Sequence, residues 1–197
     1  MKSSYLRASA ALACAVLLTA CGGSDGQLLL GGQISGVTKP GMVLTNNGGS
    51  DYEIPVPSNG TGVTTFFFPT RISSDDKYDV QIKSTPTNVD EKTCQLFNNK
   101  GRAGFDVTTI QISCLFKTQA LTGTVSNLKS DLVVVNGSDR VPVPAGATTF
   151  AMARVAQDAP YGVSILANPA GQSCTIANGV GIMGPADVNN VTITCAP

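Results

Sequence analysis

The sequence predicts an all-β protein made of two tandem β-sandwich domains. Three observations support this prediction: a pattern of about 80 residues occurs twice, apolar and polar residues alternate at a period of two, and no amphipathic helical stretch occurs. Each copy contains about seven short antiparallel strands at intervals of about 8 to 12 residues, as expected for a small sandwich of immunoglobulin-like type. The chain has no tryptophan, so the prediction concerns the architecture and not the antibody lineage.

Motifs that occur in both copies, in the same order, predict the strands and turns of each domain. Asn-Gly pairs predict tight hairpin turns, alternate prolines predict a sheet edge, and Tyr-x-Val-x-Ile predicts a strand with one face on the core. The matching positions of the two copies are Gly32, Ile34, Ser35 and Val37 with Gly123, Val125, Ser126 and Leu128; Asn47-Gly48 with Asn136-Gly137; Ile54 to Pro57 with Val141 to Pro144; Thr64 to Phe66 with Thr148 to Phe150; Tyr78, Val80 and Ile82 with Tyr161, Val163 and Ile165; and Val107, Ile110, Ile112 and Cys114 with Val188, Val191, Ile193 and Cys195.

The copies define the predicted domains, residues 32–116 and residues 120–197. Only about six residues, Leu115 to Ala120, separate them, which is too short for a freely flexible linker. We therefore expect the two sandwiches to lie end to end as a short rod.

An export signal precedes the first copy. Lys2 and Arg7 come before an apolar run from Ala8 to Leu18, which is shorter than the roughly 20 residues that span a bilayer. The run ends in Leu18-Thr19-Ala20-Cys21, which resembles the bacterial lipobox. This resemblance implies a signal peptide over residues 1–20, lipid attachment (palmitate included) at Cys21, and a flexible tether over residues 21–31.

The predicted partners are a membrane, reached through the lipid anchor, and an unknown protein. Gly22 stands where lipoproteins retained in the inner membrane carry aspartate, so we expect the outer membrane, with the domains facing either the periplasm or the cell surface. Removing residues 1–20 removes two basic residues and no acidic one, so 13 of each become 11 basic and 13 acidic residues, a net charge of −2. That charge implies no nucleic-acid partner.

Four cysteines remain besides Cys21 and the signal-peptide Cys14. An even number in an exported protein favours disulfides, for which three connectivities are possible. The repeat selects Cys94 with Cys114 and Cys174 with Cys195, because each copy then closes its own last strand. Zinc binding is disfavoured, because the chain has no histidine and no C-x-x-C spacing.

Enzymatic chemistry finds little support, and we predict no catalytic residue, no metal ligand and no cofactor. Without histidine the chain cannot form a Ser-His-Asp triad or a Cys-His pair. Paired carboxylates could still act or bind calcium, and the two acidic clusters that could do so are Asp75-Asp76 with Asp79, and Asp90-Glu91. Both lie in turn-like segments, and the second copy has only Asp158 nearby, so we expect solvated charges that keep a loop on the surface.

Phe66-Phe67-Phe68 is the most apolar stretch after the signal peptide. In a strand, Phe67 must point away from Phe66 and Phe68. We expect Phe66 and Phe68 in the core, and Phe67 packed on the neighbouring sandwich or its own loop; a partner-binding patch is the alternative. Glycan binding is disfavoured, because tryptophan is absent and aromatic residues are few.

The ordered set of motifs resembles repeats of uncharacterised surface lipoproteins of Gram-negative bacteria, over nearly the whole mature chain. Gln172-Ser173-Cys174-Thr175-Ile176 fits the Gln-x-Cys-Thr-Val stretch of that family, whereas Lys92 to Leu96 departs from it. The resemblance implies the fold and an envelope location, and no activity. The predicted function is a non-enzymatic envelope or surface module, a stalk or adhesion-type protein-binding domain and a possible surface antigen. The alternative is a calcium- or small-ligand-binding subunit that uses the first copy's extra loop, residues about 69 to 76.

Overall fold

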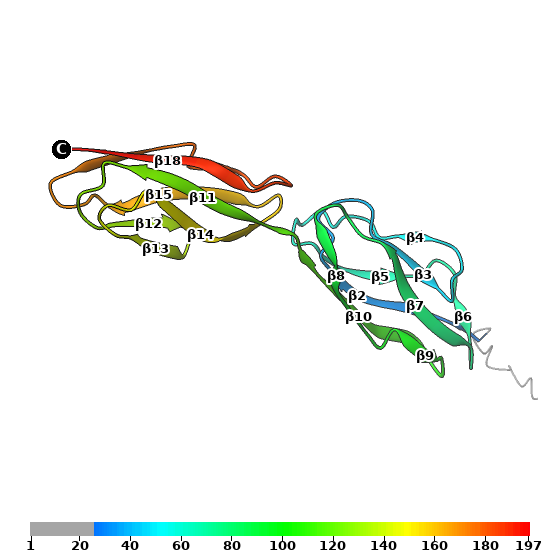
Figure 1. The fold of residues 1–197 in the computed structure, drawn as a ribbon. Helices are drawn as coiled ribbons and strands as arrows, with labels where there is room; N and C mark the ends of the chain where they lie inside the picture. The colour runs from blue at the N-terminus through cyan, green and yellow to red at the C-terminus, as the bar shows by residue number, and fades with distance from the viewer. Residues whose placement is uncertain (1–25) are drawn as a thin grey trace, which may run out of the picture.

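The computed structural model describes residues 26–197. The predicted signal peptide, residues 1–20, and the predicted lipid-attachment residue Cys21 lie outside the described residues. Every regular element in residues 26–197 is a strand, and this part of the chain contains no helix that could span a membrane. The predicted all-β fold of tandem sandwiches is confirmed, and Figure 1 shows the two sandwiches end to end.

The first sandwich contains two four-stranded sheets and a short ladder. The sheet with strand order β5-β2-β10-β8, here called the terminal sheet, holds its first and last long strands, and β4-β3-β7-β9 is the middle sheet. A two-stranded ladder, β1-β6, continues one edge. The strands are β1 (Gln27–Leu28), β2 (Leu30–Ser35), β3 (Val43–Asn46), β4 (Tyr52–Glu53), β5 (Val63–Phe67), β6 (Ile72–Ser73), β7 (Lys77–Ser84), β8 (Val89–Phe97), β9 (Lys100–Arg102) and β10 (Val107–Phe116).

The second sandwich repeats this plan. Its terminal sheet has the order β14-β11-β18-β16 and its middle sheet the order β13-β12-β15-β17. The strands are β11 (Thr118–Ser126), β12 (Leu132–Asn136), β13 (Asp139–Val143), β14 (Thr149–Ala156), β15 (Pro160–Ala167), β16 (Ser173–Ala177), β17 (Val180–Ile182) and β18 (Val188–Ala196). Each copy has one strand more than the seven expected, apart from β1 and β6 in the first copy. This additional strand, β9 or β17, is only three residues long around a glycine.

The first sandwich has two strands, β1 and β6, that have no separate counterparts in the second, because a long strand pair is interrupted in the first copy. Leu28 pairs with Ile72 in the β1-β6 ladder as Gln119 pairs with Val155 in the β11-β14 ladder. The first copy therefore breaks one long strand pair into two, at Pro69, which has no N–H to donate to a ladder. The predicted extra loop, residues about 69 to 76, is this break together with β6.

Each terminal sheet contains one parallel pair, which the sequence did not predict. β2 pairs with β10, and β11 with β18, in parallel, whereas every other pair is antiparallel. The inward-facing glycine in each first strand lies against the last strand. A β-carbon on Gly32 would lie 1.9 Å from the carbonyl oxygen of Ile110, and one on Gly123 would lie 2.4 Å from that of Val191. The parallel pair therefore requires glycine at both positions.

The disulfides join neighbouring strands of the terminal sheets. Cys94 on β8 is bonded to Cys114 on β10, and Cys174 on β16 to Cys195 on β18, the pairing that the repeat selects. Each bond therefore lies within one sheet and ties the last strand to its neighbour.

Two sequence matches are out of register in space. Leu44 pairs with Tyr52 as Val134 pairs with Val141, so the equivalent of buried Ile54 is Val143, two residues beyond the match to Val141. Likewise Asn136 is equivalent to Asn46 and not to Asn47: the side-chain oxygens of Asn46 and Asn136 accept from the backbone N–H groups of Asp79 and Gly162. Burial of the inward side chains sets the register.

The domain boundaries differ from the prediction at two places. The predicted tether, residues 21–31, includes β1 and the start of β2, because Leu28 packs against the first core and Leu30 is completely buried in it. The predicted spacer between the sandwiches shortens to one residue, since β10 ends at Phe116 and β11 begins at Thr118. The first core collects residues between 28 and 116, and the second residues between 121 and 195.

Candidate functional site

The first acidic cluster predicted from the sequence does not form a site. The Asp75 carboxylate pairs with Arg102 at 2.9 Å, and the Asp79 carboxylate pairs with Lys100 at 3.1 Å. A hydrogen bond from the Gln81 amide and, next, Lys100 hold the pKa of the Asp79 carboxyl below its ordinary value of 3.8. Asp76 accepts a hydrogen bond from the Ser73 backbone N–H at 2.8 Å. Asp75 and Asp76 thus stabilise the turn before β7, and Asp79 ties β7 to β9.

The other acidic residues are also dispersed. Asp90 accepts from the Lys92 backbone N–H at 3.2 Å, and Asp158 pairs with Lys39. Within residues 26–197, no three His, Cys, Asp or Glu side chains converge in a way that could hold a metal ion.

A small pocket lies beside the segment that the ligand-binding alternative requires. Its volume is about 190 Å³, and Tyr52, Phe68, Pro69 and Thr70 are among the residues that line it. Small-molecule sites in proteins usually measure about 300–1,000 Å³. Because the pocket is smaller than this range, the segment from Pro69 to β6 is better explained as part of the interrupted strand pair than as a ligand site.

The three consecutive phenylalanines divide as the strand period predicts. Phe66 and Phe68 are buried in the first core, and their rings lie 6.1 Å apart between centroids. Phe67 faces outward and is 42% exposed. It packs over Gly31 on the adjacent strand of its own sheet, where a β-carbon would lie 2.5 Å from the ring, and not on the neighbouring sandwich or a loop.

The outer face of the first sandwich's middle sheet is charged. Its four strands carry six charged side chains, which are Glu53, Lys77, Asp79, Lys83, Lys100 and Arg102. Three of the four ion pairs in residues 26–197 involve this sheet, and all their members are at least about two-fifths exposed. Ion pairs this exposed contribute about 0–1 kcal/mol each, so the face is mainly a solvated surface.

The same face of the second sandwich is mostly apolar, although Arg140 and Ser164 flank outward-facing Val135 on it. Its four strands carry only two charged residues, Asp139 and Arg140. Val180, Ile182 and Leu166 are 80%, 65% and 49% exposed. Outward-facing Val133, Val135, Pro142 and Pro160 extend the same surface, hereafter the apolar face.

The two middle sheets can be compared residue by residue. Lys100 pairs with Asp79 and Arg102 with Lys77, as Val180 pairs with Gly162 and Ile182 with Pro160. The glycine between each pair lies under the equivalent tyrosine: a β-carbon on Gly101 would be 2.7 Å from the Tyr78 hydroxyl, and one on Gly181 would be 2.6 Å from that of Tyr161. Val180 and Ile182 therefore occupy the positions of Lys100 and Arg102. This contrast gives no signal in the sequence, because β9 and β17 are only three residues long.

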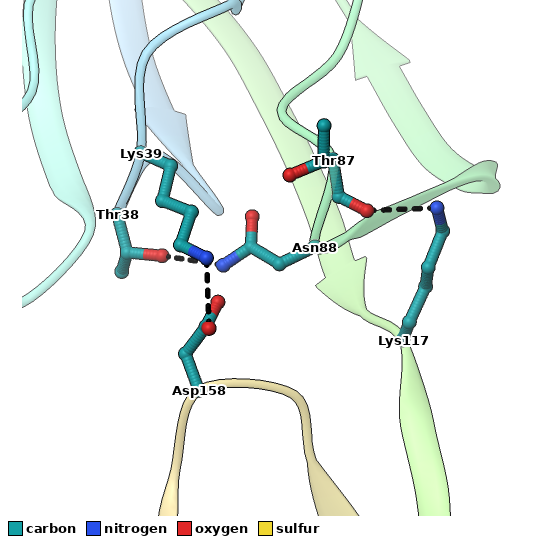
Figure 2. Close-up of polar contacts among 6 residues, drawn as sticks. All are labelled: Thr38, Lys39, Thr87, Asn88, Lys117 and Asp158. Carbon is teal, nitrogen blue, oxygen red and sulfur yellow. Dashed lines mark hydrogen bonds and ion pairs between the residues drawn. The ribbon is translucent and has the colours of Figure 1, made fainter. Parts of the chain in front are cut away.

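The junction between the sandwiches is held by hydrogen bonds on both sides of Lys117. Figure 2 shows two side-chain contacts there, from Lys117 to Thr87 and from Lys39 to Asp158. The Lys117 backbone N–H donates to the carbonyl of Asn88 in the first sandwich, and its carbonyl accepts from the Gln157 N–H in the second, both at 2.8 Å. The Lys117 ammonium donates to the Thr87 carbonyl at 2.8 Å. Lys39 reaches across the junction to Asp158, with Nζ 2.8 Å from the carboxylate oxygen. The second sandwich is thus positioned by a short joint with little free chain.

Comparisons with known proteins find weak similarity in structure and none in sequence. No known protein family matches the chain, and no curated protein matches its sequence. Two similar solved structures are major pilin proteins of Streptococcus pyogenes. The T3.2 protein is 11% identical with a TM-score of 0.37, over 86% of this chain and 98% of that chain. The T-13 protein is 11% identical with a TM-score of 0.31, over 87% and 96%. Similarity this low transfers neither activity nor assembly.

Proposed function

We propose that this chain is a non-enzymatic envelope module that binds another protein through the apolar face of its second sandwich. The observation that carries the proposal is the exposure of Val180, Ile182 and Leu166 on one sheet face. Exposed apolar surface that water must cover is unfavourable by about 25 cal/mol per Å², and contiguous patches of it commonly mark interaction sites.

The fold itself does not require these apolar side chains. The first sandwich has the same strand order and carries lysine and arginine at the positions of Val180 and Ile182. Their apolar character therefore reflects what the face contacts and not how the sandwich is built.

The size of the face indicates the kind of contact. Four strands about 4.8 Å apart, each contributing about five residues, cover roughly 300 Å². A stable interface usually buries about 800 Å² on each partner. The face alone supports a transient contact with a flat apolar protein surface, and a long-lived complex would also use neighbouring loops.

The proposal includes the lipid anchor at Cys21 and an outer-membrane location, both supported by the sequence of the export signal. In this arrangement the first sandwich is the membrane-proximal spacer and the second holds the binding face. Metabolic labelling with palmitate tests the anchor. Label should enter the wild-type protein and not a Cys21→Ser variant, which should appear in the soluble envelope fraction; equal labelling of both would exclude the anchor.

Native electrophoresis of envelopes that were crosslinked with formaldehyde and then dissolved in a mild detergent tests the binding face, because crosslinking retains a transient contact. The wild-type chain should migrate in a complex larger than its own mass. The Val180→Lys/Ile182→Arg variant, which carries the first sandwich's residues, should migrate as the free chain. The matched control, Lys100→Val/Arg102→Ile, should keep the complex. If the lysine and arginine variant stays in an unchanged complex, the apolar face is not the binding surface.

A further inference from the structure

The outer face of the first sandwich's terminal sheet carries larger side chains than its counterpart. One row of register partners across it is Thr65, Gln33, Gln111 and Phe97, where the second sandwich has Thr149, Thr124, Thr192 and Ala177. Outward-facing Phe67 likewise stands where the second sandwich has Ala151. Because the shorter side chains serve the same fold, Phe67, Phe97, Gln33 and Gln111 are not needed to form the sheet.

A groove of about 470 Å³ lies on this face. Its lining comes from β5 (Thr65 and Phe67), β2 (Gly32 and Gln33), β10 (Thr108, Thr109, Ile110 and Gln111) and Asn98 directly after β8. Its volume falls within the range of about 300–1,000 Å³ that is common for ligand sites. None of the nine lining residues is ionisable.

The lining selects the chemistry of the ligand. An ionic ligand would find no opposite charge in the groove. The amides of Gln33 and Gln111 each offer both a donor and an acceptor, as do the threonine hydroxyls, and this matches ligands whose own groups are hydroxyls. The Asn98 amide nitrogen already donates to the Thr109 carbonyl at 3.2 Å, so Asn98 mainly offers its side-chain oxygen. The half-exposed Phe67 ring supplies an apolar platform with a negative face, which suits the C–H face of a sugar ring.

We propose that this groove binds a neutral polysaccharide, with Phe67 as the stacking residue and Gln33 and Gln111 as hydrogen-bonding residues. The site is on the other sandwich from the apolar face and does not depend on it. The scarcity of aromatic residues argued against glycan binding in the sequence, but the fold places Phe67 beside Gln33 and Gln111 on one sheet face. The groove is open along the sheet, so it suits a stretch of a chain.

Affinity electrophoresis of the full mature chain tests the proposal. Native gels would contain one of four neutral polysaccharides, hydroxyethyl cellulose, glucomannan, galactomannan or glycol chitin, with carboxymethyl cellulose as the charged partner of the first. We expect retardation by at least one neutral polymer and weaker retardation by carboxymethyl cellulose than by hydroxyethyl cellulose where the latter binds. Phe67→Ala, the residue of the second sandwich, should weaken binding at least tenfold.

Matched variants separate the groove from general effects. Phe105→Ala removes another exposed phenylalanine of the same sandwich, outside the groove, and should bind as the wild type. If Phe67→Ala fails to fold, Gln33→Thr/Gln111→Thr copies the second sandwich and should weaken binding. Val180→Lys/Ile182→Arg should leave it unchanged. The proposal is overturned if no neutral polymer retards the chain, if only the charged polymer does, or if folded groove variants bind like the wild type.

Discussion

The middle sheet of the first sandwich carries six charged side chains, and the equivalent sheet of the second carries two, although strand order and pairing are the same. The inward positions changed little: Val80 and Val163 are both buried, as are Ile110 and Val191. The inward residues have the same packing task in both copies, whereas an outward residue meets only what the face contacts. Differences between equivalent outward positions therefore locate function in a protein that has two copies of one fold.

The largest effect on the free energy of unfolding should come from removing the disulfides, which the two sandwiches share at equivalent positions. Each disulfide closes a separation of 20 or 21 residues, so by loop-closure entropy each stabilises its sandwich by about 3 kcal/mol. We expect Cys94→Ala/Cys114→Ala and Cys174→Ala/Cys195→Ala to lower the free energy of unfolding of their own sandwiches by similar amounts, as measured by denaturant titration. A loss in only one sandwich would break the equivalence.

The inward glycines should show the next largest effect. A β-carbon at Gly32 or Gly123 would meet a backbone carbonyl oxygen of the parallel neighbour, which cannot move without shifting a strand. We expect Gly32→Ala and Gly123→Ala each to cost about 1–3 kcal/mol in the same titration, as overpacked core substitutions do. Gly104→Ala, which has nothing within 4 Å of its β-carbon, is the control and should be far milder.

Acid sensitivity should sharpen the contrast between the middle sheets. The lowered pKa of the Asp79 carboxyl means that its stabilising contribution is full above its ordinary pKa of 3.8 and is lost as pH falls through the lower folded value. The equivalent residue, Gly162, has no such group. A carboxyl-detected NMR titration should show Asp79 titrating below its ordinary value in the wild type, and closer to it in Lys100→Ala. An Asp79 pKa at or above 3.8 would contradict the structure.

The junction should give the smallest effect on stability. The side chains of Lys39 and Asp158 are 41% and 36% exposed, so their ion pair contributes under about 1 kcal/mol. Lys39→Ala should leave the melting temperature nearly unchanged and widen the range of angles between the sandwiches, measured by residual dipolar couplings. An unchanged range of angles would show that the Lys117 hydrogen bonds alone fix the joint.

Much of this fold could be predicted from the sequence because the same pattern of strands and turns occurs in it twice. Tyr78, Val80 and Ile82 predicted their strand and its inward face, and the cysteines predicted their partners. Ile54 was assigned the wrong equivalent because Ile-Pro-Val-Pro looks the same after a shift of two residues, and only burial distinguishes the registers. β9 and β17 are too short to show a period, so the charges on one and the aliphatic residues on the other gave no signal until the strands were placed side by side.

Photo-crosslinking at structurally equivalent positions tests the central claim most directly. A photoreactive phenylalanine would replace Val180 in one variant and Lys100 in the other, and intact cells would be irradiated. We predict a discrete protein adduct from position 180 and none from position 100, because only the apolar face contacts a partner. Adducts of equal yield from both positions, or from position 100 alone, would contradict the assignment of binding to the second sandwich.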